Sequence, residues 1–296
     1  MMQPFIERLN KNVVLFDGAM GTQLINKGMK HNDCAERWVL DHRETILNIH
    51  RDYVRAGAEV LTTDTFCGTK FHLEKHGLAA RLDDISREAV RCAREAAEDK
   101  AFVAGDVGPS GLMYPPMGNA TDALLEDLFA EQIESLLKES PDIILIETQY
   151  DLREALSALR SARKLTTLPI GVTMTYNHTK RGFYTLVGNS VSQCCQAIAA
   201  EGADFMGANC TLTPEDMLEL APLLASSAEL PVLIQPNAGQ PVLGSDGVTY
   251  KTTAEAFAKS AARLLVKGVG AIGGCCGTSP LFIKYLRDLL DMRTTL

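Results

Sequence analysis

The chain has 296 residues, of which 46% are hydrophobic and 22% charged, which allows a large buried core and argues against wholesale disorder. Its net charge of -8 argues against a nucleic-acid partner and against attraction to an anionic membrane. No apolar run approaches the ~20 residues of a membrane span, and the polar start, Met1–Asn12, lacks the pattern of a signal peptide. We therefore expect a cytoplasmic protein whose eight cysteines are reduced thiols.

Short apolar runs rich in β-branched residues recur along the chain and predict eight strands. They are Val13–Phe16, Val60–Thr63, Phe102–Gly105, Ile143–Glu147, Ile170–Thr175, Phe205–Ala208, Val232–Gln235 and Gly270–Gly273. Amphipathic patterns between them predict helices. The clearest are Asp84–Glu98, Leu124–Lys138, Leu152–Lys164, Ser192–Glu201, Pro214–Leu224 and Ala254–Lys267.

The same turn closes three of these helical stretches. Gly57, Gly202 and Gly268 each stand just past a helical stretch and just before a strand, where glycine can adopt the left-handed conformation. Strict alternation of strand and helix requires parallel strands, and eight such units can close into a barrel. We therefore predict a single (β/α)8 TIM barrel over residues 1–296, with an open doubly wound sheet as the competing fold.

The longest connections follow the first, second, third and fifth predicted strands. The first of them runs roughly from Asp17 to Asp41. In a barrel, such strand-to-helix connections all lie on the catalytic face, so the polar and glycine-rich strand ends should converge there.

Three cysteines at strand ends are candidate zinc ligands. Cys210 ends the sixth predicted strand, and Cys275 and Cys276 follow the eighth. A catalytic zinc site uses three protein ligands and one open position, and glycines on both sides of the vicinal pair would let both side chains turn toward one ion. Simple packing of buried thiols is the alternative, and the usual spacing of an iron–sulfur site is absent.

The other cysteines are expected to be packing residues. The vicinal pair Cys194-Cys195 begins a predicted helix without flanking glycines, and Cys92 lies within a helix. Cys34 and Cys67 lie in catalytic-face loops, where packing is again the favoured interpretation.

Two further features of the catalytic face are candidate binding elements. The turn Asp17, Gly18, Ala19, Met20, Gly21, Thr22 lacks the third glycine of a dinucleotide fingerprint, but its backbone N–H groups suit a carboxylate or phosphate. Glu147 ends an apolar run, so its carboxylate is either part of a structural ion pair or a partner for a substrate cation.

Together these motifs resemble the zinc-dependent homocysteine S-methyltransferase family over about residues 12–290. The matching segments are Phe16–Thr22, Gly207–Cys210 and Gly273–Thr278. The resemblance implies a homocysteine-binding barrel with zinc on Cys210, Cys275 and Cys276, the homocysteine sulfur being the fourth ligand. It also implies that Glu147 binds the homocysteine ammonium, that Asp17–Thr22 forms the floor of the amino-acid site, and that Asn209 lies beside the first zinc cysteine.

Several loops look closest to the cobalamin-dependent branch of that family: Asp33–Glu36 with Trp38, Thr62–Phe66 and Gly105–Gly111. The sequence departs from it at Asp64, where Asn is usual, and at Arg181–Thr185. This likeness implies that methyl-cobalamin on a separate corrinoid protein supplies the methyl group that converts homocysteine, or a similar thiol, into methionine. The alternatives are a free-standing enzyme with S-methylmethionine, S-adenosylmethionine or another onium donor, and a non-catalytic zinc- or thiol-binding module of a larger assembly.

Overall fold

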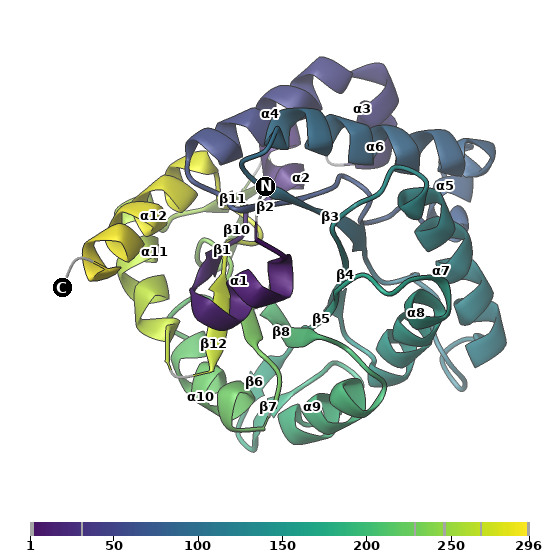
Figure 1. Ribbon diagram of the computed structural model, residues 1–296. Coiled ribbons are helices and arrows are strands. Elements are labelled where there is room, and N and C mark those ends of the chain that lie inside the picture. Colours follow the sequence, from purple (N-terminus) through teal and green to yellow (C-terminus); the bar gives the residue numbers. More distant parts are fainter. Residues whose placement is uncertain (1–2, 31, 228, 245–246, 267, 295–296) are drawn as a thin grey trace.

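Eight parallel strands form the centre of the computed structural model, which describes residues 3–30, 32–227, 229–244, 247–266 and 268–294. The strands are hydrogen-bonded in the order β1-β12-β9-β8-β5-β4-β3-β2. A parallel bridge between Phe16, directly after β1, and Val60 of β2 joins the two ends of this order and closes the ring. Figure 1 shows the helices surrounding this ring. The predicted TIM barrel is confirmed, and an open doubly wound sheet is excluded because no edge strand remains.

The barrel strands lie within a few residues of their predicted positions. They are β1 (Val14–Leu15), β2 (Val60–Thr62), β3 (Phe102–Val107), β4 (Ile143–Gln149), β5 (Ile170–Met174), β8 (Phe205–Asn209), β9 (Val232–Gln235) and β12 (Val269–Ile272). The largest differences are at the ends of β3 and β4, which continue two residues further than expected because their last residues still pair with a neighbouring strand.

Helices occupy the connections between barrel strands, and α12 follows the last strand. They are α2 (Met20–Asn26), α3 (Ala35–Asp41), α4 (Arg43–Arg55), α5 (Lys70–Glu74), α6 (Leu82–Ala97), α7 (Asp122–Leu137), α8 (Leu152–Leu165), α9 (Val191–Ala200), α10 (Met217–Ser227), α11 (Ala254–Ala261) and α12 (Pro280–Thr294), with 3-10 turns at Ala79–Arg81 and Ala262–Leu264. The predicted helix Ala254–Lys267 changes to a 3-10 turn after Ala261, and Lys267 itself lies outside the described residues.

The glycine turns behave as the sequence predicted. Gly57, Gly202 and Gly268 have φ values of 96°, 93° and 102°, in the left-handed region. A side chain is disfavoured there, so glycine lets the chain reverse from helix to strand without strain.

Three local structures were not predicted. The polar N-terminal segment contains a helix, α1 (Phe5–Lys11), and two hairpins are inserted into strand-to-helix connections: β6 (Asn177–Thr179) with β7 (Gly182–Tyr184), and β10 (Pro241–Gly244) with β11 (Gly247–Tyr250). The unfamiliar segment Arg181–Thr185 therefore belongs largely to the β6–β7 hairpin.

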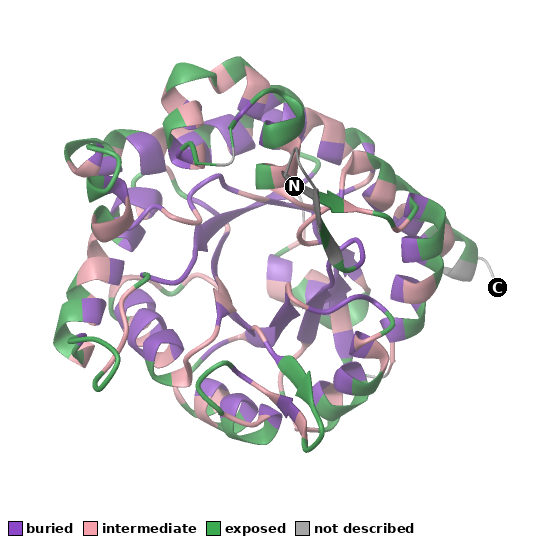
Figure 2. Cartoon of the chain, turned by 180° about the vertical axis from the view of Figure 1, so that it is seen from behind, coloured by how far each residue is buried: buried purple, intermediate pink, exposed green. Residues whose placement is uncertain are grey.

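The inward-facing residues divide the barrel into an apolar and a polar half. Phe102 and Phe205, at the starts of β3 and β8, and Phe16, directly after β1, pack in one buried cluster with Phe5 of α1. In Figure 1, α1 lies across the middle of the ring of strands. Figure 2, from the opposite side, shows buried residues along the strands and exposed residues on the outer helix faces. Apolar contacts thus close the amino end of the barrel, whereas the carboxyl end carries polar side chains.

Within the part of the chain that the structure describes, no helix is both long and apolar enough to cross a membrane.

Candidate metal and thiol-binding site

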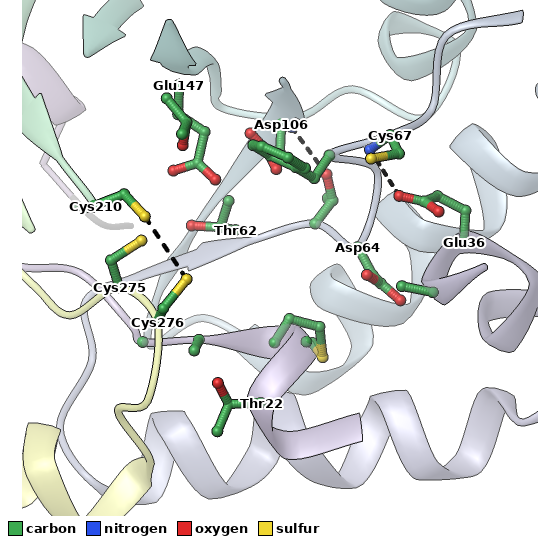
Figure 3. A pocket seen from close by; sticks show the side chains of 18 of the residues that line it. Thr22, Glu36, Thr62, Asp64, Cys67, Asp106, Glu147, Cys210, Cys275 and Cys276 are labelled. Carbon is green, nitrogen blue, oxygen red and sulfur yellow. Dashed lines mark hydrogen bonds between the residues drawn. The ribbon is translucent and has the colours of Figure 1, made fainter. Parts of the chain in front are cut away.

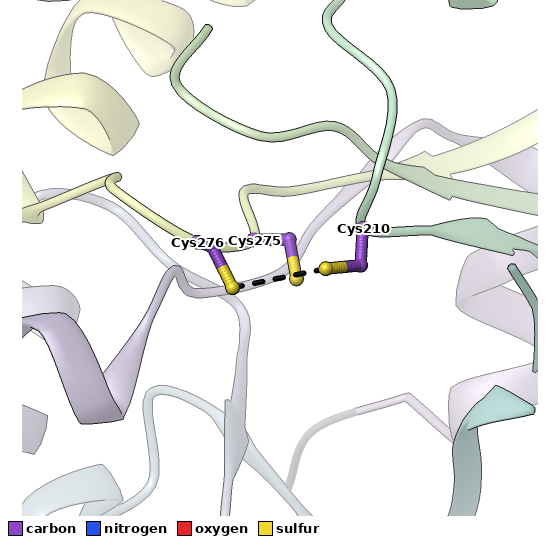
Figure 4. Close-up of side chains that lie close together, drawn as sticks. All are labelled: Cys210, Cys275 and Cys276. Atoms are coloured by element: carbon purple, nitrogen blue, oxygen red, sulfur yellow. Dashed lines mark hydrogen bonds between the residues drawn. The ribbon is translucent and has the colours of Figure 1, made fainter. Parts of the chain in front are cut away.

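Three cysteine sulfurs meet at the carboxyl end of the barrel. Cys210 follows β8, and Cys275 and Cys276 follow β12. The three sulfurs lie within 4.8 Å of one another, and the Sγ atoms of Cys210 and Cys276 are 3.7 Å apart. Figure 4 shows the three side chains pointing toward one another. Zinc binds thiolates at about 2.3 Å in a tetrahedron, which corresponds to a sulfur–sulfur edge of about 3.8 Å. The spacing therefore fits three corners of a zinc tetrahedron and leaves the fourth corner for another ligand.

The backbone near these cysteines takes unusual conformations. Cys210 and Thr211 have φ values of 62° and 61°, which residues other than glycine rarely adopt. Gly277, with φ 82°, turns the chain directly after Cys276, and a Cβ atom there would lie 2.3 Å from the ring of Tyr250. Such conformations persist only where the surrounding structure enforces them, and they concentrate at functional sites.

The sulfur of Cys275 has a polar side chain as a hydrogen-bond partner. Asn209 Nδ2 donates to Cys275 Sγ over 3.8 Å. Hydrogen bonds of this kind hold a metal-binding side chain in one orientation and adjust how strongly it donates to the metal.

The three thiols also interact with one another. Because Cys275 and Cys276 donate hydrogen bonds to the sulfur of Cys210, the pKa of the Cys210 thiol lies well below its usual value. The same interactions raise the pKa values of Cys275 and Cys276. A cluster that stabilises one buried thiolate is suited to a cation, because a cation would stabilise all three.

The cysteines open onto a cavity of about 560 Å³. The residues predicted for the site that line it are Asp17, Gly18, Ala19, Met20, Gly21, Thr22, Glu147, Cys210, Cys275 and Cys276. Asn209 is 1% exposed and does not line the cavity, so its side chain acts on the site through its neighbours.

Comparison with known proteins identifies the family. A sequence model described as homocysteine S-methyltransferase matches residues 14–290. The chain belongs to the homocysteine S-methyltransferase family. Methionine synthases from Mycobacterium tuberculosis and Mycobacterium leprae are each 31% identical over 297 residues that cover 94% of this chain. The match covers 25% and 24% of those proteins, so this family member spans about a quarter of the length of these relatives.

A solved structure supports the fold of this family member. The homocysteine methyltransferase MmuM from Escherichia coli, in its metallated form, is similar with a TM-score of 0.81 and 23% identity, covering 97% of this chain and 100% of that one. The oxidised form of the same protein has a TM-score of 0.83 at 22% identity. At this level of identity, the structural similarity shows that this chain and MmuM share the barrel fold.

Glu147 lies near the end of β4 and lines the cavity together with the three cysteines. Asn209 Nδ2 donates to its Oε2 over 3.4 Å and to Thr148 Oγ1 over 2.7 Å. No Lys or Arg among the described residues forms an ion pair with Glu147. A structural ion pair, one of the two roles that the sequence offered for this carboxylate, is therefore not formed there. Burial and the charges of Asp17 and Cys210 raise the pKa of Glu147 to about 8, a cost that a substrate cation would offset.

The Asp17–Thr22 turn connects β1 to α2 beside the same cavity. Both carboxylate oxygens of Asp17 accept hydrogen bonds from Thr62, one from its backbone N–H at 2.8 Å and one from its hydroxyl at 2.9 Å. Thr278 Oγ1 accepts from the Ala19 N–H, and Thr22 Oγ1 accepts from the Gly277 N–H. These bonds fix the turn against the loop that carries Cys275 and Cys276.

The cysteines outside the cluster divide into two groups. Cys92, Cys194 and Cys195 are buried among apolar side chains, as packing residues would be. Cys34 and Cys67, for which packing was also the favoured interpretation, line the cavity, and Cys34 packs in a buried apolar cluster as well. Their loops fold back over the carboxyl end of the barrel, a long-range contact that residue type alone could not reveal.

Several cavity residues were not named as site residues from the sequence, although most of them belong to strand ends and loops that were expected on the catalytic face. They are Glu36, Thr62, Thr63, Asp64, Phe66, His72, His76, Asp106, Thr148 and Gln235. Strand register offered a signal for part of this set: Thr62, Asp106 and Gln235 each come two residues after an inward apolar residue and so face inward as well. Glu36 lies in α3 and Asp64 in the loop after β2, so strand register gave no signal for either of them.

Proposed function

We propose that this chain transfers a methyl group to the sulfur of homocysteine or a similar small thiol. The observation that carries the proposal is the group of three cysteine sulfurs within 4.8 Å of one another at the edge of a cavity large enough for a small-molecule substrate. Three thiol ligands and an open side match a catalytic metal site, whereas a structural site would close with a fourth protein ligand.

We propose zinc as the metal, held by Cys210, Cys275 and Cys276. When bound, zinc would supply Lewis acidity that keeps the substrate sulfur as a nucleophilic thiolate at neutral pH. The side chain of Asn209 would hold Cys275 in place through the hydrogen bond described above.

The remaining site residues are proposed to bind the amino-acid part of the acceptor. Glu147 would pair with the substrate ammonium, and Asn209 would hold Glu147 in position through its amide. The Asp17–Thr22 turn would form the floor of the site, with Asp17 kept in place by Thr62. We further propose that residues 1–296 act as one homocysteine-binding domain.

The methyl donor is proposed in two forms. A methyl-cobalamin carried by a separate corrinoid protein is supported by the likeness to methionine synthases, although the match covers only a quarter of their length. A small onium compound is supported by the acidic lining of the cavity. A non-catalytic thiol-binding module is the alternative of another class.

A purified-protein assay tests the function. Metal content would be measured first, and the protein would then be incubated with homocysteine and, separately, a methylated corrinoid protein, S-methylmethionine or S-adenosylmethionine. We expect about one zinc per chain and methionine formation with at least one donor, lost on chelation and restored by zinc. Full zinc content without methionine from any of these donors would favour the non-catalytic module.

A further inference from the structure

The side-chain amide of Asn209 lies between two parts of the proposed site. Its Nδ2 is within hydrogen-bond distance of Glu147 Oε2, at 3.4 Å, and of Cys275 Sγ, at 3.8 Å. In Figure 3 the carboxylate of Glu147 lies on the same side of the cavity as the three cysteine side chains. One buried nitrogen therefore contacts both the residue proposed to bind the substrate ammonium and a proposed metal ligand.

The oxygen end of this amide accepts two hydrogen bonds. The donors are the backbone N–H of Thr148, at 2.9 Å, and the hydroxyl of Thr173, at 2.8 Å. The Nδ2 end also donates to Thr148 Oγ1 at 2.7 Å. An amide turned by 180° would direct its NH2 group at the Thr148 N–H, where two donors would meet, and its oxygen at the Glu147 carboxylate. Thr148 and Thr173 therefore favour the orientation in which the NH2 group faces Glu147 and Cys275.

The backbone at Thr148 departs from a regular strand. Its φ is 58°, which a β-branched residue rarely adopts, and the pairing of β4 with β5 shifts register between Ile146 and Gln149. The Thr148 N–H bonds to the side chain of Asn209 at this irregularity. Such a conformation costs free energy and persists only where the surrounding structure enforces it, which is typical of functional sites.

Thr173 lies inside the barrel, on β5, and is fully buried. It comes two residues after Gly171, where an added side chain would meet the ring of Phe205, so both positions face the inner surface. Burying a hydroxyl costs free energy unless it forms a hydrogen bond, and the bond to Asn209 offsets this cost. Thr173 does not line the cavity, so it acts on the acceptor through Asn209.

We propose that Thr148 and Thr173 are positioning residues that lock the Asn209 amide and thereby set the chain length of the thiol acceptor. The inference rests on the proposed function, in which the acceptor binds through its ammonium at Glu147 and through its sulfur at the cysteine cluster. With the amide locked, one nitrogen holds Glu147 and Cys275 at a fixed spacing. A thiol one methylene shorter than homocysteine reaches both points only by displacing one of them. The lock therefore selects homocysteine over free cysteine.

Calorimetry of homocysteine and free cysteine on the zinc-loaded full chain tests the lock. We expect wild type to bind homocysteine at least about tenfold more tightly, because a missing methylene group typically costs roughly 10–200-fold in a fitted site. Thr173→Val keeps the shape of the side chain and removes the hydroxyl, so it should reduce this preference by about three- to tenfold. Thr173→Ser restores the hydroxyl and should keep the preference within about twofold of wild type.

Thr175→Val is the matched control. Thr175 lies two residues further along the chain, and its hydroxyl donates at 3.1 Å to the backbone carbonyl of Asn209 rather than to the amide. This variant should keep the preference for homocysteine within about twofold. Zinc content should be unchanged in all three variants, because the cysteines remain. No loss of preference in Thr173→Val, or an equal loss in Thr175→Val, would overturn the lock.

Failure of the proposed function would look different. Wild type that retains zinc but binds neither thiol would contradict thiol activation at this site, and the lock with it. Equal affinity of wild type for the two thiols would leave thiol binding intact and overturn the chain-length assignment. If Thr173→Val fails to fold, Thr148→Val tests the same orientation, because it removes the oxygen that accepts from Asn209 Nδ2. An unchanged preference in that variant would also count against the lock.

Discussion

The two ends of this barrel are built from the same strands and serve opposite purposes. At the amino end, Phe5 contacts the rings of Phe102 and Phe205 with centroid distances of 5.4 Å each, within a buried apolar cluster. At the carboxyl end, the residues two positions further along the strands are polar, such as Asp106 after Ala104 and Glu147 after Leu145. One strand register therefore places stabilising and reactive side chains on the same inner surface.

The difference teaches where this protein gains and where it loses stability. Aromatic burial at the amino end contributes favourable free energy, because large apolar surfaces leave water and pack against one another. The carboxyl end has costs: unpartnered carboxyl oxygens and positive φ values at Cys210 and Thr211. Barrels commonly separate stability and catalysis between their two faces in this way. Three substitutions test how complete the separation is here.

The largest effect is expected for Cys275→Ala. Loss of a hydrogen-bond partner of a metal ligand typically costs roughly 10–100-fold in metal affinity or activity, so loss of a ligand should cost more than about 100-fold. The readouts are zinc content and methionine formation. Cys194→Ala is the matched control, because Cys194 is fully buried in α9 away from the cavity; it should keep its zinc and lose only about 1 kcal/mol of stability. Equal zinc loss in both variants would contradict the assignment of the cluster.

Phe205→Ala should affect the opposite end. The ring of Phe205 occupies the space above Gly171 and contacts Phe5. Removing a buried aromatic ring is expected to lower the free energy of unfolding by about 3–5 kcal/mol. Urea denaturation gives this value, and Leu223→Ala on the exposed surface of α10 should change it by less than about 0.5 kcal/mol. The KM for homocysteine should stay within about twofold; a larger change would mean that the two ends are coupled.

The smallest of the three effects is expected for Asp17→Asn, which should change how the free energy of unfolding depends on pH. Burial raises the pKa of Asp17 from 3.8 to about 7, so the folded state holds its proton more tightly than the unfolded state. The stability that this proton provides is complete below about pH 4 and is lost as pH rises through 7. In metal-free protein, wild type should therefore lose up to about 4 kcal/mol relative to Asp17→Asn between pH 4 and 8.

Urea denaturation of both proteins at several pH values measures this difference. Parallel curves for wild type and Asp17→Asn would show that the Thr62 hydrogen bonds keep Asp17 ionised at neutral pH, and the cavity would then carry a fixed negative charge rather than a proton.

The sequence alone was sufficient for the barrel and the cysteine cluster. Strand and helix patterns are local, and alternation of the two leaves parallel strands as the only arrangement. Glycines 57, 202 and 268 marked the reversals, because left-handed φ angles are read from residue type. The proximity of Cys210, Cys275 and Cys276 was predictable because strand ends converge in a closed barrel. The glycine-flanked pair was separated from Cys194-Cys195 on the same local grounds.

Only the tertiary structure decided what surrounds that cluster. The polar N-terminal segment gave no sign that Phe5 would close the far end, since one aromatic residue carries no periodicity. Asp106 reaches the cavity through the register of β3, whereas Glu36 of α3 and Asp64 of the loop after β2 join it only because these segments pack over the barrel mouth. Local pattern determines which way a strand residue points, but packing across the barrel determines which buried groups remain without a partner.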